Sequence, residues 1–180
     1  MNQLSPMAER FVLHFGEMGR HWGMSRSVAQ IFALLFVSGR ALNADELVEI
    51  LGISRSNVGA GLKDLAGWRL VHPVPLAGDR REFFAVPEDA WEVLRRLALE
   101  KRRRELLPTL EFLGEALRQS AQDGAERQDQ ARLRALYDLL DLFCSWFDDV
   151  QKLSPQTLER LMRLGSRVSR VLDAGPGRRE

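Results

Sequence analysis

The sequence has few of the features that mark several common protein classes. It holds one cysteine, Cys144, which excludes a disulfide within the chain and fits a reducing, cytoplasmic location. No apolar run approaches the about 20 residues that a membrane-spanning helix needs. The start of the chain also lacks the basic segment and apolar core of a secretion signal. We therefore expect a cytoplasmic protein that does not interact with a membrane.

The motifs of common enzyme classes are missing as well. There is no glycine-rich phosphate loop, no Gly-x-Ser-x-Gly and no His-Glu-x-x-His. His14, Glu17 and His21 share one face of a predicted helix and can in principle hold a metal. No further cysteine or histidine is nearby, so the polar side of an amphipathic helix is the favoured interpretation. We expect no enzyme activity, no metal and no cofactor.

Net charge is small, at +1, and the basic excess lies in residues 1–104. A nucleic-acid-binding protein of this composition has to gather its basic groups locally. The 180 residues, 45% of them hydrophobic, are enough for one domain, or for one domain with an appended helical lobe.

The stretch from Asn43 to Val86 predicts two helices, a tight turn between them and a hairpin. Asn43 and Glu46 have the spacing of a capping box, and Gly52 stands where the first helix should end. Ser54 can cap the second helix. Apolar residues then recur at the spacing of one buried face: Val58, Leu62 and Leu65. This is the helix-turn-helix pattern, whose second helix enters the major groove of DNA.

The outward face of that second helix carries polar and small side chains. Ser56, Ala60 and Lys63 lie opposite the buried face, with Asn57 beside them and Arg55 near the boundary, and such groups can approach phosphates and base edges. Gly59 and Gly61 each cost about 1 kcal/mol relative to alanine in a helix. They indicate either a close approach to DNA or to a neighbouring helix, or small residues tolerated in a helix that its inner face holds.

A basic hairpin is predicted to follow. Leu70–Leu76 and Glu82–Val86 are expected strands, joined through Ala77–Arg80, where Gly-Asp marks a turn. Pro73 and Pro75 make the first strand an edge strand. Arginines at such a tip can enter the minor groove or bind phosphates. A helix-turn-helix with a basic hairpin is a winged helix.

Three stretches carry a resemblance to a known family. VAQIFALLF, LGISRSNVGAGLKDLAGWRLV and GDRREFF occupy Val28–Phe36, Leu51–Val71 and Gly78–Phe84. They resemble the helix before the turn, the recognition helix and the wing of MarR-like winged-helix regulators, in particular of the GbsR branch. The resemblance runs from about Phe11 to Leu117. It implies a homodimeric, ligand-responsive transcriptional regulator that binds double-stranded DNA at a pseudo-palindromic operator.

The resemblance also implies roles for individual residues. Asp79 and Arg81 match the Asp-x-Arg of the MarR-type wing, with Asp79 bracing the tip. Gly59-Ala60-Gly61 departs from the family pattern in being smaller. The implied DNA contacts on the recognition helix and the wing are Ser54, Arg55, Ser56, Asn57, Lys63, Arg80 and Arg81.

The expected fold class is mainly α with a small β-hairpin wing. Residues 24–87 form the winged helix-turn-helix, and residues 1–23 and 88–173 form a helical dimerisation lobe. Residues 174–180 are expected to be a disordered tail. The helices after Pro87 hold more large apolar residues than a lone winged helix needs, which favours a dimer lobe over a larger monomeric core. Pro108 should kink or break its helix near Arg104.

Three features of the sequence leave alternatives open. Arg102, Arg103 and Arg104 can bind phosphate, but a solvated face that pairs with Glu100 and Glu105 is favoured. The winged helix itself can be a protein–protein adaptor without DNA function, given the small net charge. Cys144 lies in an apolar stripe and is expected in the core rather than as a redox sensor.

Aromatic residues suggest an effector site. The GbsR branch is associated with glycine betaine synthesis and uptake, so the resemblance suggests a quaternary ammonium effector. Aromatic faces hold such a cation at about 0.5–2 kcal/mol per contact. The alternative, that these side chains are core and dimer packing, is favoured. The candidate effector-binding residues are Trp22, Trp91, Tyr137 and Trp146.

Overall fold

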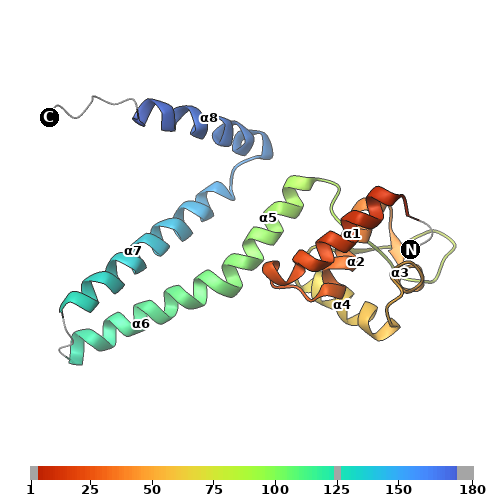
Figure 1. Ribbon diagram of the computed structural model, residues 1–180, viewed down its shortest axis with the longest axis horizontal. Coiled ribbons are helices and arrows are strands. Elements are labelled where there is room, and N and C mark those ends of the chain that lie inside the picture. The colour runs from red at the N-terminus through yellow and green to blue at the C-terminus, as the bar shows by residue number, and fades with distance from the viewer. Residues whose placement is uncertain (1–3, 124–126, 174–180) are drawn as a thin grey trace. The chain divides into compact units, whose positions relative to one another are not determined.

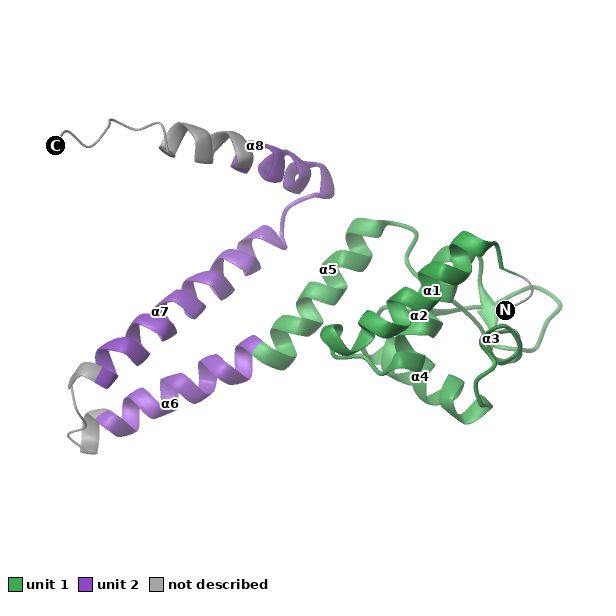
Figure 2. Cartoon of the chain, viewed as in Figure 1, with its two compact units in different colours: residues 1–105 green, residues 106–180 purple. Residues whose placement is uncertain are grey.

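The computed structural model describes residues 4–123 and 127–173 of the chain, which divides into two compact units, residues 1–105 and 106–180 (Figure 2). Helices dominate both units, and a three-stranded antiparallel sheet lies in the first. This confirms the predicted fold class of a mainly α winged helix. None of the described helices combines the length and the apolar character needed to cross a membrane.

The first unit begins with two helices, α1 (Pro6–Met18) and α2 (Arg26–Ser38), which pack side by side (Figure 1). Ser5 and Ser25 cap them, each side chain accepting from a backbone N–H of the first turn. Two glycines of the first segment allow the close packing. A Cβ on Gly16 or on Gly19 would lie 2.6 Å from an atom of α2. Sequence analysis expects His14, Glu17 and His21 on one helix, but the α-helix ends at Met18 and Gly19–Trp22, which include His21, form a tighter 3₁₀ turn, η1.

The helix-turn-helix consists of α3 (Ala44–Leu51) and α4 (Arg55–Gly67). The predicted capping box is present: the Asn43 N–H donates to Glu46 Oε2 at 2.9 Å, and Asn43 Oδ1 accepts from the Glu46 N–H at 3.0 Å. Gly52 ends α3 with a φ of 65°, a conformation that glycine adopts without strain. The turn between the helices is therefore fixed by local chemistry at both of its ends.

The sheet has the strand order β1-β3-β2, with β1 (Leu42–Asn43), β2 (His72–Val74) and β3 (Phe83–Ala85). Pro73 lies in β2 at the edge, as predicted. The prediction of a two-stranded hairpin is incomplete, because a third strand, β1, also belongs to the sheet. The two predicted strands are also shorter than expected. β1 pairs with β3 through Leu42 and Phe84. A two-residue strand that runs directly into a helix cap leaves no alternating pattern in the sequence.

The core of the first unit lies between α2 and the helix-turn-helix. The predicted inward face of α4 is buried, and α2 packs against it. The largest fully buried side chains come from these elements, the first helix and the adjoining strand and linker: Val12, Ile31, Leu34, Leu35, Leu42, Leu47, Val58, Leu65 and Leu70. This core sets the rotation of α4, so its opposite face is turned to solvent.

After the wing, α5 (Ala90–Lys101) is capped by Asp89, whose Oδ1 accepts from the Trp91 N–H at 2.9 Å. A π-helical turn, η2 (Arg102–Leu106), follows. The turn ends just before Pro108, which has no N–H to donate to the carbonyl one helical turn earlier, that of Arg104. The predicted irregularity before Pro108 is therefore present as a wider turn.

The second unit comprises α6 (Leu107–Asp123), α7 (Arg127–Val150) and α8 (Pro155–Asp173). α6 and α7 lie side by side as a helical hairpin (Figure 1). Leu113, Leu117 and Cys144 are buried, so the prediction of a core cysteine is confirmed. The predicted tail, 174–180, lies outside the described residues. The assignment of residues 1–23 and 88–173 to a dimerisation lobe stays a prediction.

Candidate nucleic-acid interface

The outward face of α4 begins at its capping residue. Ser54 Oγ accepts from the Asn57 N–H at 3.3 Å and lies 3.0 Å from the Ser56 hydroxyl. The free N–H groups and the partial positive charge of a helix start are suited to phosphate. All the α4 residues singled out as DNA contacts are exposed: Ser54, Arg55, Ser56, Asn57 and Lys63.

Arg55 forms an ion pair that its sequence position does not indicate. Its guanidinium binds the carboxylate of Asp45 on α3. The two side chains are 71% and 56% exposed, and pairs this exposed contribute little to stability, at about 0–1 kcal/mol. An external anion can therefore replace Asp45 as the partner of Arg55 at small cost.

The two central glycines of α4 differ in their surroundings. A Cβ on Gly61 would lie 2.6 Å from Ile31 Cδ1 on α2, whereas a Cβ on Gly59 would meet nothing within 4 Å. The close approach that the sequence left open is thus, for Gly61, an approach to the neighbouring helix. Gly59 is exposed, and its missing side chain leaves the α4 backbone accessible at this position.

The wing tip is organised by Asp79. Gly78, with a φ of 84°, turns the chain, and the carboxylate of Asp79 then accepts from the Arg81 backbone N–H at 3.0 Å and from its guanidinium at 2.5 Å. These hydrogen bonds lower the pKa of Asp79 to about 2, the Arg81 side chain contributing most. The Arg81 guanidinium also lies over the Phe83 ring, 5.5 Å from its centroid.

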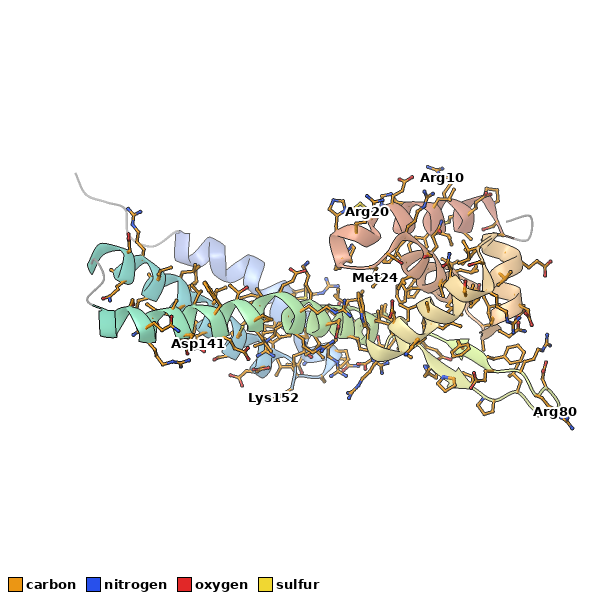
Figure 3. The ribbon with its side chains drawn as sticks, turned by 90° about the horizontal axis from the view of Figure 1, so that it is seen from below. Arg10, Arg20, Met24, Arg80, Asp141 and Lys152 are labelled. Atoms are coloured by element: carbon orange, nitrogen blue, oxygen red, sulfur yellow. The ribbon has the colours of Figure 1, made fainter. Side chains whose placement is uncertain are left out.

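Arg80 remains at the tip of the loop between β2 and β3, pointing away from the sheet (Figure 3). Within the described ranges, neither Arg80 nor Lys63 lies within 4 Å of a carboxylate oxygen. The four basic candidates therefore divide into two braced arginines, Arg55 and Arg81, and two cations available to an external anion.

The aromatic candidates belong to different units, Trp22 and Trp91 to the first and Tyr137 and Trp146 to the second. Trp22 lines an apolar pocket of about 260 Å³ in the first unit, whereas Trp91 does not. Tyr137 and Trp146 belong to α7 of the second unit, where Trp146 lies 6.0 Å from the ring of Phe143. The pocket residues beside Trp22 are all apolar: Phe11, Phe15, Phe32, Phe36, Ala90, Val93, Leu94 and Leu97.

Four phenylalanines of this pocket were missed by sequence reasoning. Phe11 and Phe15 are one turn apart on α1, and Phe32 and Phe36 are one turn apart on α2. Their rings form a closed set of contacts, with neighbouring centroids between 5.5 Å and 6.2 Å apart. The two i, i+4 pairs could have indicated an aromatic face on each helix. The sequence alone does not indicate that these two faces pack against each other.

His14 and Glu17 lie on α1, and His21 lies in η1. Across the part of the chain that the structure describes, no three histidine, cysteine or acidic side chains come close enough to share a metal ion.

The elements described above define the class of protein: a winged helix-turn-helix domain followed by a helical unit. The model of the MarR family matches residues 22–82, from η1 to the wing. The crystal structure of a transcriptional regulator superposes with a TM-score of 0.63 at 22% identity, covering 81% of this chain and 96% of that one. It shares the fold.

Two further solved structures are more distant. An S. aureus MepR mutant bound to an oligodeoxyribonucleotide has 10% identity and a TM-score of 0.39, covering 78% of this chain and 92% of that one. A transcriptional regulator from Thermotoga maritima has 19% identity and a TM-score of 0.39, covering 79% and 92%. Comparison with curated proteins finds no match.

Proposed function

We propose that this protein is a MarR-like transcriptional regulator that binds double-stranded DNA as a homodimer. One observation carries the proposal: an exposed polar face on α4, centred on Ser56, Asn57 and Lys63, occurs in the same unit as a wing with an outward arginine at its tip. The match of residues 22–82 to the MarR family model supports the same function.

In the proposed complex, α4 enters the major groove with its first turn foremost. Ser54 and Asn57 hydrogen-bond to phosphates or base edges, and Lys63 pairs with the backbone. Arg80 reaches the minor groove or its phosphates, while Asp79 holds Arg81 so that the wing tip is ordered before contact. Since Gly59 and Ala60 add no bulk, the helix backbone approaches the DNA closely.

The homodimer is supported by a second apolar face on α7. Leu139, Leu142 and Trp146 are 63%, 66% and 52% exposed, and they recur at helical spacing on a side of α7 different from that of buried Cys144. Exposed apolar residues that gather on one face mark association sites. Two copies joined through this unit present two recognition helices, suited to half-sites about 34 Å apart.

Selection of bound fragments from genomic DNA tests the proposal. The chain is expected to enrich a small set of sites with two similar half-sites. Replacing Arg80 with Ala should weaken binding to all sites similarly and lower the salt dependence by about one phosphate contact. Recovery of fragments without any shared sequence would contradict the proposal.

We also infer that the pocket lined by Trp22 and four phenylalanines binds an effector. The resemblance to the GbsR branch suggests a quaternary ammonium compound, whose methyl groups fit aromatic faces. The lining residues hold no charged group, so the rings alone would have to hold the cation. Choline and glycine betaine should quench or shift tryptophan fluorescence in the wild type and not after Trp22→Phe. No signal at millimolar concentration in the wild type would rule out this ligand class.

The alternative is a winged-helix adaptor that binds a protein. It is favoured by the pairing of Arg55 with Asp45 and of Arg81 with Asp79, which weakens the positive stripe. An adaptor would bind its partner equally well after Arg80→Ala and would have no affinity for DNA at moderate salt.

A further inference from the structure

The C-terminal end of α4 has an unusual backbone. Arg69, the second residue after the helix, has a φ of 58°, and within the described residues it is the one non-glycine residue with positive φ. This conformation is disfavoured for any residue with a Cβ. The Arg69 carbonyl accepts a hydrogen bond from the guanidinium of Arg96 on α5. The strained end of the helix is thus held by a side chain from another element.

The residue before it, Trp68, is also contacted by an arginine from a later part of the chain. Its side chain is 7% exposed, and its indole Nε1 has no hydrogen-bond acceptor among the described atoms. The guanidinium carbon of Arg104 lies 4.3 Å from the centre of the ring. A cation over the face of a buried indole is a favourable contact, and a strong one where water is excluded.

Each of the two arginines is fixed by a carboxylate one helical turn before it. Glu92 Oε1 lies 2.6 Å from Arg96 Nε, and Glu100 Oε1 lies 2.5 Å from Arg104 Nε. We call Glu92, Arg96, Glu100 and Arg104 the α5 clamp. Its members recur every four residues, with each glutamate N-terminal to its arginine, the favourable order on a helix.

The inner glutamate of the α5 clamp is buried. Glu100 is 8% exposed, and hydrogen bonds from Arg103 first and Arg104 second lower its pKa despite that burial. A buried carboxylate that stays charged is a firm anchor for the arginines it binds. Arg104 lies in the π-helical turn η2, a type of irregularity that often occurs at functional sites.

From these contacts we propose that the α5 clamp fixes the tilt of the recognition helix, and that Arg104, through Trp68, is a positioning residue for DNA binding. The buried face of α4 sets its rotation about its own axis, while the clamp holds its last turn in place. Small errors at that end change where Ser56, Asn57 and Lys63 point. The inference rests on the proposed DNA-binding function.

The test compares Arg104→Gln with a matched control, Arg103→Gln. Both arginines bind Glu100, but only Arg104 lies over Trp68. Affinity for a selected genomic site should fall about fivefold to tenfold in Arg104→Gln and less than about twofold in the control. Arg104→Lys, which keeps the cation, should recover most of the loss. Trp68→Phe combined with Arg104→Gln should add little to either change alone.

The salt dependence of binding separates positioning from direct contact. A phosphate contact contributes about 0.9 to the slope of log K against log salt concentration. The slope of Arg104→Gln should equal that of the wild type. A smaller slope, equal losses in Arg104→Gln and Arg103→Gln, or a lower melting temperature with unchanged affinity would each overturn the proposal.

If Arg104→Gln does not fold by circular dichroism, Trp68→Phe and Arg104→Lys carry the test. Trp68→Phe should then lower the affinity with an unchanged salt slope while Arg104→Lys stays close to the wild type, and wild-type affinity in Trp68→Phe would overturn the proposal. A wild type without preference for any site would instead refute the proposed function, and the clamp's role in DNA binding with it. The wild-type binding measurement alone reveals that outcome, so failure of the proposed function is distinguished from failure of the clamp proposal.

Discussion

At the scale of single residues, the two glycines in the middle of α4 have opposite surroundings and should respond differently to alanine. Gly59→Ala gains helix propensity in open space, worth about 1 kcal/mol. Gly61→Ala gains the same propensity but places a Cβ 2.6 Å from the buried Ile31 side chain. Overpacking of that kind costs about 1–3 kcal/mol. Denaturant unfolding should therefore find Gly61→Ala less stable than Gly59→Ala. Equal stabilities would mean that α2 and α4 are farther apart.

Asp79 should report the order of the wing through its titration. Arg81 lowers the pKa of Asp79 from 3.8 to about 2, chiefly through the side-chain hydrogen bond. Because the folded pKa is depressed, the stabilisation is fully present above the ordinary value of 3.8 and is lost as the pH falls through about 2. Carboxyl NMR should give a midpoint near the lower value, and Arg81→Gln should raise it. A wild-type midpoint at the ordinary value would mean that the tip is not braced.

At the scale of elements, the parts encoded by neighbouring residues could be predicted. The capping box of Asn43 and Glu46, the turn at Gly52 and the edge strand with Pro73 each depend on a few adjacent side chains. They are present as expected. The same holds for the exposed face of α4, because its apolar stripe fixes which side is buried.

The parts missed by the sequence analysis depend on pairs that are far apart in the chain. β1 exists because Leu42 meets Phe84. Arg104 was expected on a solvated face; it does pair with Glu100 as expected, but it also lies over Trp68, 36 positions earlier. The phenylalanine-lined pocket likewise requires α1 and α2 to be packed together. No periodicity in a single helix contains that information.

At the scale of the whole molecule, the exposed apolar face of α7 gives the oligomer prediction. Replacing Leu139 and Leu142 together with Lys places two charges on that face and should convert a dimer into a monomer in light scattering after gel filtration. Asp141→Lys is the matched control: Asp141 is exposed on another side of α7 and should leave the dimer intact. A wild-type monomer, or a dimer that survives the double change, would exclude this interface.

Sequence-specific DNA binding is best tested by the affinity of the chain for one selected genomic site, measured against random duplex DNA across a range of salt concentrations. A regulator built on this winged helix should prefer its site by at least about a thousandfold. Its affinity should fall steeply with salt as phosphate contacts release counterions. Equal affinity for the selected site and random DNA at every salt concentration would contradict the account.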